Sequence, residues 1–415
     1  MKTHVGMVSQ WYDPERGSAA LPGIISRSLH QRGHKVDVVT GVPNYPTGSV
    51  YSGYSVRPYR RENIQNVTVH RAPLYPSHDS NPIKRATNYL SFAVAASAVA
   101  TAALRDVDSV LVHSTPATAA LPALALKALR RKPFVVHIQD LWPQTVVSSG
   151  FLDESRAGWV ERTLHRYCDT VYRHAHTVAV TSPGMAELVA RRGVDEKKIA
   201  FVPNWADERA FRPVERDVEL ARRLGISRSL TVMYAGNFGE FQALDTLIDA
   251  ATILRDRSDI GFALIGGGVE EARLRKVVED RGLENVVFVG QQPFDRMAAV
   301  LALGDIQLVS LQDLPLFRTT LPSKLQATLA AGRPVLGAVT GDAAEVIRGS
   351  AAGVVVTPGS AVEMAEAIVN LSNLAPIERQ SLGAAGRAHY LERYSEEVAA
   401  DRLSDLLERA ARSTA

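Results

Sequence analysis

Short, fully apolar runs alternate with helix-like segments along nearly the whole chain. In the first half these runs include "KVDVVTG", "DSVLVHS" and "KPFVVHIQD", and a segment with helical spacing of its apolar residues follows each of them. Strands that are apolar at every position are typical of parallel sheets covered by helices on both faces. The alternation therefore predicts an α/β fold built from doubly wound parallel sheets.

The same pattern starts again after a Pro-containing junction near residues 203–213. Because 415 residues exceed what one hydrophobic core usually serves, we expect two Rossmann-like domains. We place them at residues 1–203 and 204–389, and we expect residues 390–415 to form an amphipathic helix that crosses back to the first domain. Ligands of open parallel sheets bind outside the carboxyl ends of the strands, so two such domains facing a central cleft would place the site there.

The composition is that of an ordinary globular protein, with 46% apolar and 22% charged residues. The single cysteine, Cys168, excludes an intrachain disulfide, and the N-terminal segment is typical of a first strand rather than a signal peptide. We therefore expect a cytoplasmic protein. No recognised nucleic-acid-binding motif accompanies the basic residues, so we do not expect a nucleic-acid partner.

Basic residues are concentrated in the first half of the chain. Residues 1–200 hold 24 Lys and Arg against 15 Asp and Glu. This excess is either a set of solvated surfaces or a face that approaches an anionic membrane or a lipid diphosphate. The residues proposed for the second interpretation are Arg60, Arg61, Lys84 and Arg85. The apolar segment 88–106 is shorter than the ~20 residues needed to span a bilayer, so we expect either a core helix or a helix that lies at the membrane surface.

In the first half, small or polar residues follow the predicted strands. Gly17 and Ser18 open a helix, where backbone N–H groups can approach a phosphate or a hydroxyl. His113 ends the strand "DSVLVHS", and Asp140 and Trp142 follow the next strand. Each has a structural alternative: an ordinary loop, a buried core histidine, or a carboxylate that caps the next helix.

In the second half, glycines follow two neighbouring strands. Gly236, Asn237 and Gly239 form a turn in "YAGNFGE", and three glycines, beginning with Gly266 and Gly267, follow "IGFALI". Glycine lets the main chain close on an anionic ligand at a helix N-terminus. The segment "GGGVEEA" does not have the G-x-G-x-x-G spacing of a dinucleotide-binding loop.

The segment "LPSKL" places a hydroxyl and an ammonium at the start of a helix. Pro322, Ser323 and Lys324 occupy the first turn, and Arg318 precedes them in the same loop. Free N–H groups, the helix dipole and a point charge together favour a diphosphate. The alternative is a helix start that is simply solvated.

In order along the chain, these segments resemble the retaining glycosyltransferases of family four, which have the GT-B fold. The resemblance rests on the "VHSTP" histidine, the "VPNW" junction, "YAGNFGEFQALDTLI", "LIGGGVEEARL" and "AAGRPVLGAVTGDAAEVIRG". Within the family, "HIQDLWP" and "LPSKL" are most similar to bacterial transferases of surface-polysaccharide assembly, of the fucosamine and colanic-acid type.

The resemblance implies transfer of a sugar from a nucleotide diphosphate sugar, with UDP as our first expectation for the nucleotide, and with the anomeric configuration retained. The second domain would hold the donor. The first would hold the acceptor, either a lipid-linked saccharide at the inner face of the cell membrane or a soluble small molecule. No cofactor and no metal are expected, because helix N-termini and cations would neutralise the leaving diphosphate.

The resemblance assigns roles to His113 and Gly17, and the other candidates rest on their positions in the chain and on their charge. His113 would contact the donor sugar near the reacting carbon, and Asp140 is the second catalytic candidate. The residues expected on the donor side are Gly17, Ser18, Gly236, Asn237, Gly239, Gln242, Gly266, Gly267, Arg318, Ser323 and Lys324. Those expected on the acceptor or membrane side are Trp142, Arg60, Arg61, Lys84 and Arg85.

Three positions depart from the family pattern. Two glutamates found in many members are replaced by Thr319 and Ala327, and a loop lysine is replaced by Gln242. With that lysine absent, Lys324, together with Arg318, becomes the expected source of positive charge on the diphosphate. A non-catalytic nucleotide-sugar-binding protein and a nucleotide-sugar 2-epimerase are the alternative functions, although the acidic pair that an epimerase would need is not evident.

Overall fold

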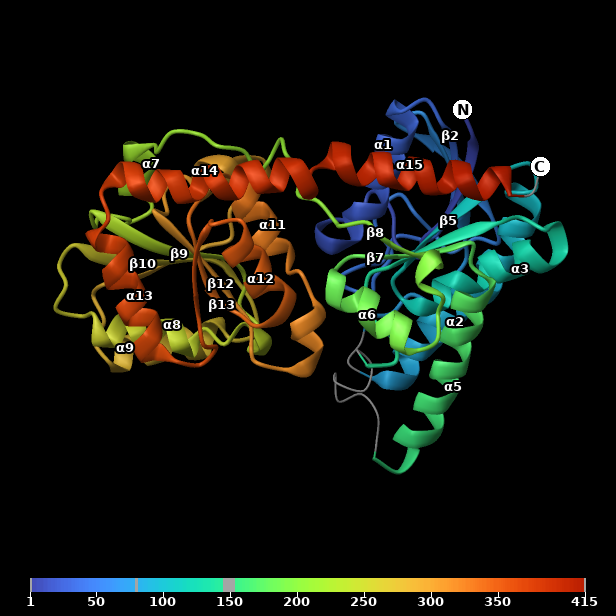
Figure 1. Cartoon of the computed structure of the whole chain (residues 1–415). Helices are drawn as coiled ribbons and strands as arrows, with labels where there is room; N and C mark the ends of the chain where they lie inside the picture. Colours follow the sequence, from blue (N-terminus) through green and yellow to red (C-terminus); the bar gives the residue numbers. More distant parts are fainter. Residues whose placement is uncertain (1, 79–80, 145–153, 414–415) are drawn as a thin grey trace. The chain divides into compact units, whose positions relative to one another are not determined.

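The computed structural model of the chain describes residues 2–78, 81–144 and 154–413 (Figure 1). The chain divides into two compact units. The first unit comprises residues 1–202 and 400–415, and the second comprises residues 203–399.

The described residues of the first unit form one eight-stranded sheet in the order β3-β4-β2-β1-β5-β6-β7-β8. Its strands are β1 (His4–Val8), β2 (Lys35–Gly41), β3 (Arg60–Ile64), β4 (Val67–Ala72), β5 (Ser109–Ser114), β6 (Phe134–Ile138), β7 (Thr177–Val180) and β8 (Ile199–Phe201). The edge strand β3 is antiparallel to β4, and the other neighbours are parallel. Every residue of β5 and β6 is buried, as the apolar runs predicted.

Helices cover both faces of this sheet (Figure 1). They include α1 (Leu21–Gln31), α2 (Pro82–Ala103), α3 (Leu121–Arg130), α5 (Glu154–His174) and α6 (Pro183–Arg191). The largest hydrophobic cluster lies between the sheet and α2, α3, α5 and α6, and it contains Phe92 and Phe134. The alanines of α2 at positions 96 and 100 are fully buried, because small side chains let the helix approach the sheet closely.

By length and composition alone, α2 is apolar enough to cross a membrane. One face of the helix nevertheless packs inside the first unit, where Asn88, Phe92 and Ala96 are buried. Its opposite face leaves Leu90 and Val94 exposed. The helix therefore covers one face of the sheet, and its solvent-facing side carries an apolar stripe.

The described residues of the second unit form a six-stranded, fully parallel sheet in the order β11-β10-β9-β12-β13-β14. Its strands are β9 (Leu230–Asn237), β10 (Ile260–Gly267), β11 (Val286–Gly290), β12 (Ile306–Ser310), β13 (Val335–Ala338) and β14 (Gly353–Val356). Its helices include α7 (Val218–Arg223), α8 (Asp245–Ile253), α9 (Glu271–Asp280), α10 (Met297–Leu301), α11 (Ser323–Ala330), α12 (Gly341–Gly349), α13 (Ala361–Asn373) and α14 (Pro376–Arg393). Two separate hydrophobic clusters, one with α8, α9 and α13 and the other with α7 and α10, pack on this sheet.

The last helix, α15 (Glu396–Arg412), begins in the second unit and continues in the first. In the first unit it is fixed by an ion pair between Arg32 and Asp401 and by a hydrogen bond between His34 and Ser404. Residue 390, where the sequence analysis places a boundary, lies inside α14, and the buried Tyr390 hydroxyl donates to the carbonyl of Ala206 in the same unit. Two parallel α/β sheets with helices on both faces confirm the predicted fold class.

Two arginines at the edge of the first sheet form ion pairs with the same carboxylate. Because one is buried and the other exposed, we expect their removal to lower the free energy of unfolding by different amounts. Glu62 pairs with Arg71, whose side chain is 1% exposed, and with Arg60, whose side chain is 39% exposed. Arg71 also donates to the carbonyls of Gly41 and Asp13. Breaking the buried pair leaves Glu62 without its main partner, so Arg71→Ala should lower the free energy of unfolding by about 3–5 kcal/mol. Chemical denaturation would measure this loss.

Arg60→Ala is the matched control for that experiment, because it removes an exposed partner of the same carboxylate. It should cost at most about 1 kcal/mol. Equal losses in the two variants would contradict the assignment of the stabilising role to the buried arginine.

Candidate functional site

Each sheet has one place where the strand order reverses, and ligands of open α/β sheets bind there, outside the carboxyl ends of the strands. In the second unit the reversal lies at β9, which pairs with β10 on one side and β12 on the other. In the first unit it lies at β1, which pairs with β2 and β5. Most of the predicted site residues lie at these two edges.

Glycine is required at the ends of β9 and β10. Gly236 has φ +152° and Gly266 has φ +130°, values that other residues rarely adopt. A Cβ at Gly266 would overlap the carbonyl of Gly236, and a Cβ at Gly236 would overlap the Lys324 ammonium. Because glycine has no side chain, the ends of β9 and β10 and the Lys324 ammonium can approach each other closely.

Among the residues described, Lys324 is the predicted cation that is largely shielded from solvent at this edge, with a half-buried side chain. Its Nζ donates to the Tyr234 hydroxyl at 2.5 Å and lies 4.1 Å from the centroid of the Tyr234 ring. Burial lowers the Lys324 pKa from 10.5 to about 8. Within the described part of the chain no carboxylate forms an ion pair with Lys324, so its charge remains available to an anion.

The N-terminus of α11 adds hydrogen-bond donors beside this ammonium. Pro322, in an extended conformation, precedes the helix, and no described side chain caps the first turn. Ser323 is the first helical residue and its side chain is exposed. Uncapped N–H groups, the helix dipole and Lys324 form an arrangement suited to a phosphate or diphosphate.

Arg318 has a carboxylate partner of its own. It lies in the 3-10 helix Pro315–Thr319, and its side chain forms an ion pair with Asp313 at 3.2 Å. Thr340 donates a second hydrogen bond to Asp313. These contacts lower the Asp313 pKa, with Arg318 as the larger cause. Arg318 is thus held by an acidic neighbour, unlike Lys324.

The loop after β9 is fixed by local hydrogen bonds and aromatic contacts. The Gln242 side chain accepts a hydrogen bond from the Gly239 N–H at 3.1 Å. Phe241 packs edge-on against Phe317, with ring centroids 5.6 Å apart. Asn237 is exposed, and Gly267, at the end of the neighbouring strand β10, is buried. Gln242 therefore shapes the turn in the structure described here.

At the edge of the first sheet, His113 is buried beside a second histidine. The ring centroids of His113 and His137 are 6.3 Å apart, and the Nε2 of His137 donates to the carbonyl of Val202. The Nδ1 of His113 is buried without a hydrogen-bond partner among the described residues. Burial lowers the pKa of His113 to about 3 and that of His137 to about 4. Both rings are therefore neutral at physiological pH.

Asp140 and Trp142 follow β6, the strand next to that of His113. Burial raises the Asp140 pKa, and the Thr115 hydroxyl, 3.5 Å away, donates a hydrogen bond to its carboxylate. Thr115 follows His113 closely in the chain, so the two catalytic candidates lie on neighbouring strand ends. The Trp142 carbonyl accepts a hydrogen bond from Arg192, and its ring contacts Tyr89.

The loop between β1 and α1 contains a buried carboxylate that the sequence analysis did not identify. Gly17 lies in this loop with φ +68° and opens the 3-10 helix Gly17–Ala20, whereas the Ser18 side chain lies outside the described part of the structure. Glu15 is 2% exposed, and its carboxylate accepts N–H groups from Tyr12, Asn44 and Tyr45. The only sequence signal was its place two residues before Gly17.

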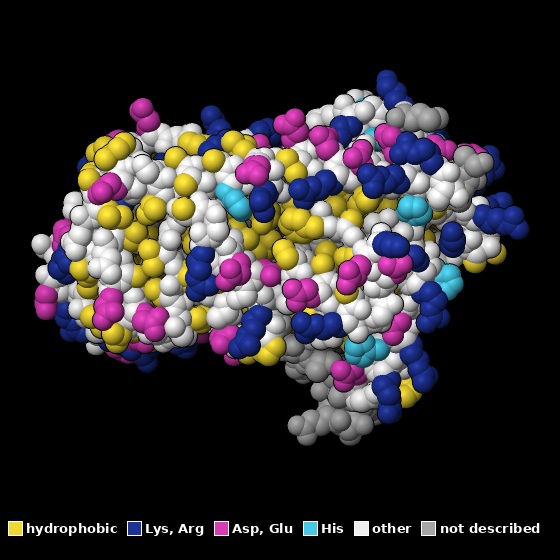
Figure 2. Space-filling model, in the orientation of Figure 1, with side chains coloured by type: hydrophobic (Ala, Val, Ile, Leu, Met, Phe, Trp, Pro, Cys, Tyr) yellow, Lys and Arg dark blue, Asp and Glu magenta, His cyan; other side chains and the backbone are white. Residues whose placement is uncertain are grey.

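Basic residues of the first unit lie along a sheet edge and a helix start. Arg60 and Arg61 begin β3, and Lys84 and Arg85 lie in the first turn of α2. Figure 2 shows Lys and Arg side chains spread over the first unit and interleaved with acidic ones. These four residues therefore belong to a mixed surface with a basic excess.

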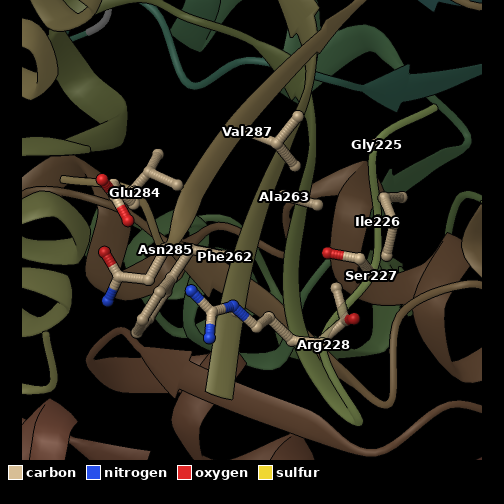
Figure 3. Close-up of a pocket in the computed structure, with 12 residues that line it drawn as sticks. Gly225, Ile226, Ser227, Arg228, Phe262, Ala263, Glu284, Asn285 and Val287 are labelled. Atoms are coloured by element: carbon tan, nitrogen blue, oxygen red, sulfur yellow. The ribbon is translucent and has the colours of Figure 1, made fainter. Parts of the chain in front are cut away.

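A small pocket lies at the opposite edge of the second sheet (Figure 3). Its walls include Thr231 near the start of β9, Gly261 near the start of β10 and Asn285 just before β11. The Arg228 stem packs over Gly261, and its guanidinium donates to the carbonyl of Ser258 at 2.7 Å. Because it lies at the amino ends of the strands, this pocket is separate from the candidate site.

The chain matches two known families along most of its length. Residues 23–205 match the glycosyl transferase 4-like domain, and residues 229–373 match the glycosyl transferases group 1 family. A putative colanic acid biosynthesis glycosyl transferase, WcaI of Escherichia coli K12, is 32% identical over 77% of this chain and 79% of its own length. A probable glycosyltransferase, WbjE of Pseudomonas aeruginosa, is 24% identical over 73% and 75% of the two chains.

Solved structures share the fold at low sequence identity. A sucrose-phosphate synthase of Thermosynechococcus elongatus has a TM-score of 0.74 at 18% identity, covering 99% of this chain and all of that chain. The HepE protein of Anabaena, solved in complex with UDP-glucose, has a TM-score of 0.68 at 16% identity, covering 98% of this chain and 100% of that chain. These similarities show the fold alone. The substrates of this chain have to be inferred from its own residues.

Because burial disfavours the charged form of Lys324, we expect its contribution to the free energy of unfolding to depend on pH. Its pKa is 10.5 in the unfolded chain and about 8 in the folded chain, so the unfolded chain binds more protons between these values. The cost is therefore fully present below pH 8 and is relieved as the pH rises through 8 toward 10.5. Lys324→Met should raise the free energy of unfolding at pH 7 by up to about 3 kcal/mol.

Denaturation of the ligand-free protein at pH 7 and pH 10 would measure this gain. The control is Arg318→Met, an exposed cation of the same edge, which should change stability by no more than about 0.5 kcal/mol at either pH. A Lys324→Met variant that is less stable than the wild type at pH 7 would contradict the cost assigned to burial.

Proposed function

The chain belongs to family four of the glycosyltransferases and has the GT-B fold, and from that premise we propose a donor, an acceptor and roles for its residues. It transfers a sugar from a nucleotide diphosphate sugar, with UDP as the proposed nucleotide. The proposed acceptor is a hydroxyl of a lipid-linked saccharide in the assembly of a cell-surface polysaccharide, with retention of the anomeric configuration. WcaI and WbjE support the polysaccharide assignment through their similarity.

The single observation that carries the donor assignment is Lys324. A half-buried ammonium with a neutral hydroxyl as partner lies at the carboxyl edge of the second sheet, next to the uncapped start of α11. A diphosphate placed there would accept N–H groups and would restore the charge that burial disfavours. We therefore assign the nucleotide diphosphate to the second unit and the neutralisation of the leaving group to Lys324.

His113 is proposed to act as a neutral hydrogen-bonding group. With a pKa of about 3, its ring is neutral at physiological pH and cannot act as a general acid. The departing β-phosphate oxygen would instead take the proton of the acceptor hydroxyl while the new bond forms on the same face of the sugar. The protein then contributes position and preorganised positive charge, which are the terms that usually dominate such reactions.

Thermal stabilisation by nucleotides tests the donor site. UDP, GDP, ADP and dTDP would each be added to the wild type, to Lys324→Ala and to Lys276→Ala, an exposed lysine of α9 that serves as the control. At 100 times its dissociation constant a nucleotide adds roughly 2.7 kcal/mol. We expect selective stabilisation of the wild type and of the control, and a clear loss in Lys324→Ala.

Stabilisation that is the same in all three proteins would place the diphosphate elsewhere. If none of the four nucleotides stabilises the wild type, the donor assignment fails, and a different role must be sought for the second unit.

The membrane assignment rests on α2 and its neighbours. Leu90 and Val94 are exposed on the outer stripe of the helix, and Lys84 and Arg85 lie in its first turn. This helix packs on β2 and β4, and β4 pairs with the edge strand that carries Arg60 and Arg61. An apolar stripe beside basic residues is the pattern of a helix that lies on an anionic bilayer.

Replacing four basic residues of the first unit by glutamate should abolish co-sedimentation with phosphatidylglycerol vesicles. The residues to replace are Arg60, Arg61, Lys84 and Arg85. An equal change of charge in the second unit, at Arg222, Arg223, Lys276 and Arg348, is the control and should leave sedimentation unchanged. Equal sedimentation of both variants with the wild type would contradict the charge-based membrane contact and favour a soluble acceptor.

A further inference from the structure

Three aromatic rings meet at the carboxyl edge of the first sheet. Trp11 follows β1, Tyr45 follows β2 and His78 follows β4. The ring centroids of Trp11 and Tyr45 are 5.0 Å apart at 44°, and those of Tyr45 and His78 are 4.9 Å apart in an edge-on contact. All three side chains are partly exposed. They form a continuous aromatic surface, here called the aromatic platform, from three loops far apart in the sequence.

Glu15 connects two of these loops. One carboxylate oxygen accepts the Tyr12 N–H at 3.0 Å, and the other accepts the N–H groups of Asn44 and Tyr45 at 2.8 Å each. A buried carboxylate that receives three backbone donors holds those donors in one arrangement. The position of the Tyr45 ring relative to Trp11 therefore depends on Glu15.

Further contacts fix the remaining loop. A Cβ at Gly48 would overlap the backbone nitrogen of His78, so the loops after β2 and β4 are in direct contact. The Tyr51 hydroxyl donates to the carbonyl of Tyr45 at 2.8 Å. The aromatic platform is thus built on hydrogen-bonded backbone, which is how binding surfaces on loops keep their geometry.

The aromatic platform lies on the reacting side of the first unit. Val8 of β1 pairs with Val112 of β5, and His113 is the next residue after Val112. The loop that carries Trp11 therefore leaves the sheet next to the strand that carries His113. A buried polar atom lies here too, because the Oε1 of Gln10 has no hydrogen-bond partner among the described residues.

We propose that Trp11, Tyr45 and His78 bind a neutral sugar ring of the acceptor by stacking, and that Glu15 is the positioning residue of this subsite. The proposal rests on the proposed function, since it names the part of the acceptor that the first unit recognises. Aromatic rings supply rigid apolar faces with polar tips, which match the C–H faces and hydroxyl edges of a pyranose.

Fluorine NMR of the full chain labelled with 5-fluorotryptophan tests the aromatic platform. The chain has four tryptophans, and Trp11→Phe identifies the Trp11 resonance. The probes are the methyl α-glycosides of D-glucose, D-mannose, D-galactose and L-fucose, with glycerol as the polyol control. We expect at least one glycoside to shift the Trp11 signal in a saturable way. Trp159, whose side chain is 68% exposed on α5, is the internal control and should not move.

Tyr45→Ala should remove the response of the Trp11 resonance to the glycosides while leaving the protein fold intact by circular dichroism. A Trp11 signal that none of the four glycosides moves would overturn the proposal, as would an unchanged response in Tyr45→Ala.

Nucleotide stabilisation measured on the same samples separates the two proposals. If a nucleotide stabilises the protein but Trp11 does not respond, the aromatic platform is wrong and the donor site stands. If Trp11 responds and no nucleotide stabilises, the aromatic platform stands as a saccharide subsite and the transferase proposal fails.

Glu15→Gln tests the positioning role. The amide keeps the shape of the carboxylate but cannot accept all three N–H groups, so the glycoside should bind about tenfold more weakly, a loss of about 1.4 kcal/mol. Nucleotide stabilisation should match that of Glu196→Gln, an exposed control in the first unit. Loss of nucleotide binding together with the glycoside would show a general structural role and overturn this part of the proposal.

Discussion

The second unit contains a half-buried positive charge whose partners among the described residues are neutral. Lys324 rests on the ring and hydroxyl of Tyr234 and against the backbone of Gly236. Burial without a counter-ion disfavours the charged form, and the pKa falls to about 8. The surrounding core therefore holds the ammonium in a position that is unfavourable until an anion arrives. Such preorganisation is what makes a fixed charge effective on a leaving group.

The first unit uses the opposite charge in a different way. Glu15 is also buried, but three backbone N–H groups satisfy it, so it acts on the conformation of the loops rather than on a ligand. The two units thus share a doubly wound α/β architecture and differ in what these two charged groups do. Lys324 is the charge proposed to bind a ligand. Glu15 instead accepts backbone N–H groups and fixes the loops beside His113. This division agrees with a donor held by charge and an acceptor recognised by shape.

The sequence was sufficient for the fold and for part of the site, for physical reasons that differ by residue. Fully apolar strands predicted two helix-covered sheets, and the turn chemistry around Lys324 predicted a cation at a helix start. The role of Tyr234 was not predictable, because a tyrosine within an apolar strand looks like core until α11 is packed against it. The pairing of Arg318 with Asp313 is a contact within one loop that sequence spacing does not specify. Trp11, Tyr45 and His78 come from three loops, and only the strand order brings them together.

The departures from the family pattern and the low pKa of Lys324 have a common explanation. Position 327 lies three residues after Lys324 on α11, a spacing at which a glutamate would form an ion pair with the lysine. Ala327 removes that partner from the same helix, and Thr319 supplies no charge at the other position. A lysine paired in this way would keep a high pKa and a neutralised charge. With both carboxylates replaced, the ammonium has the diphosphate as its natural counter-ion. The absence of both glutamates is therefore consistent with the proposed role of Lys324 as the cation that binds the diphosphate.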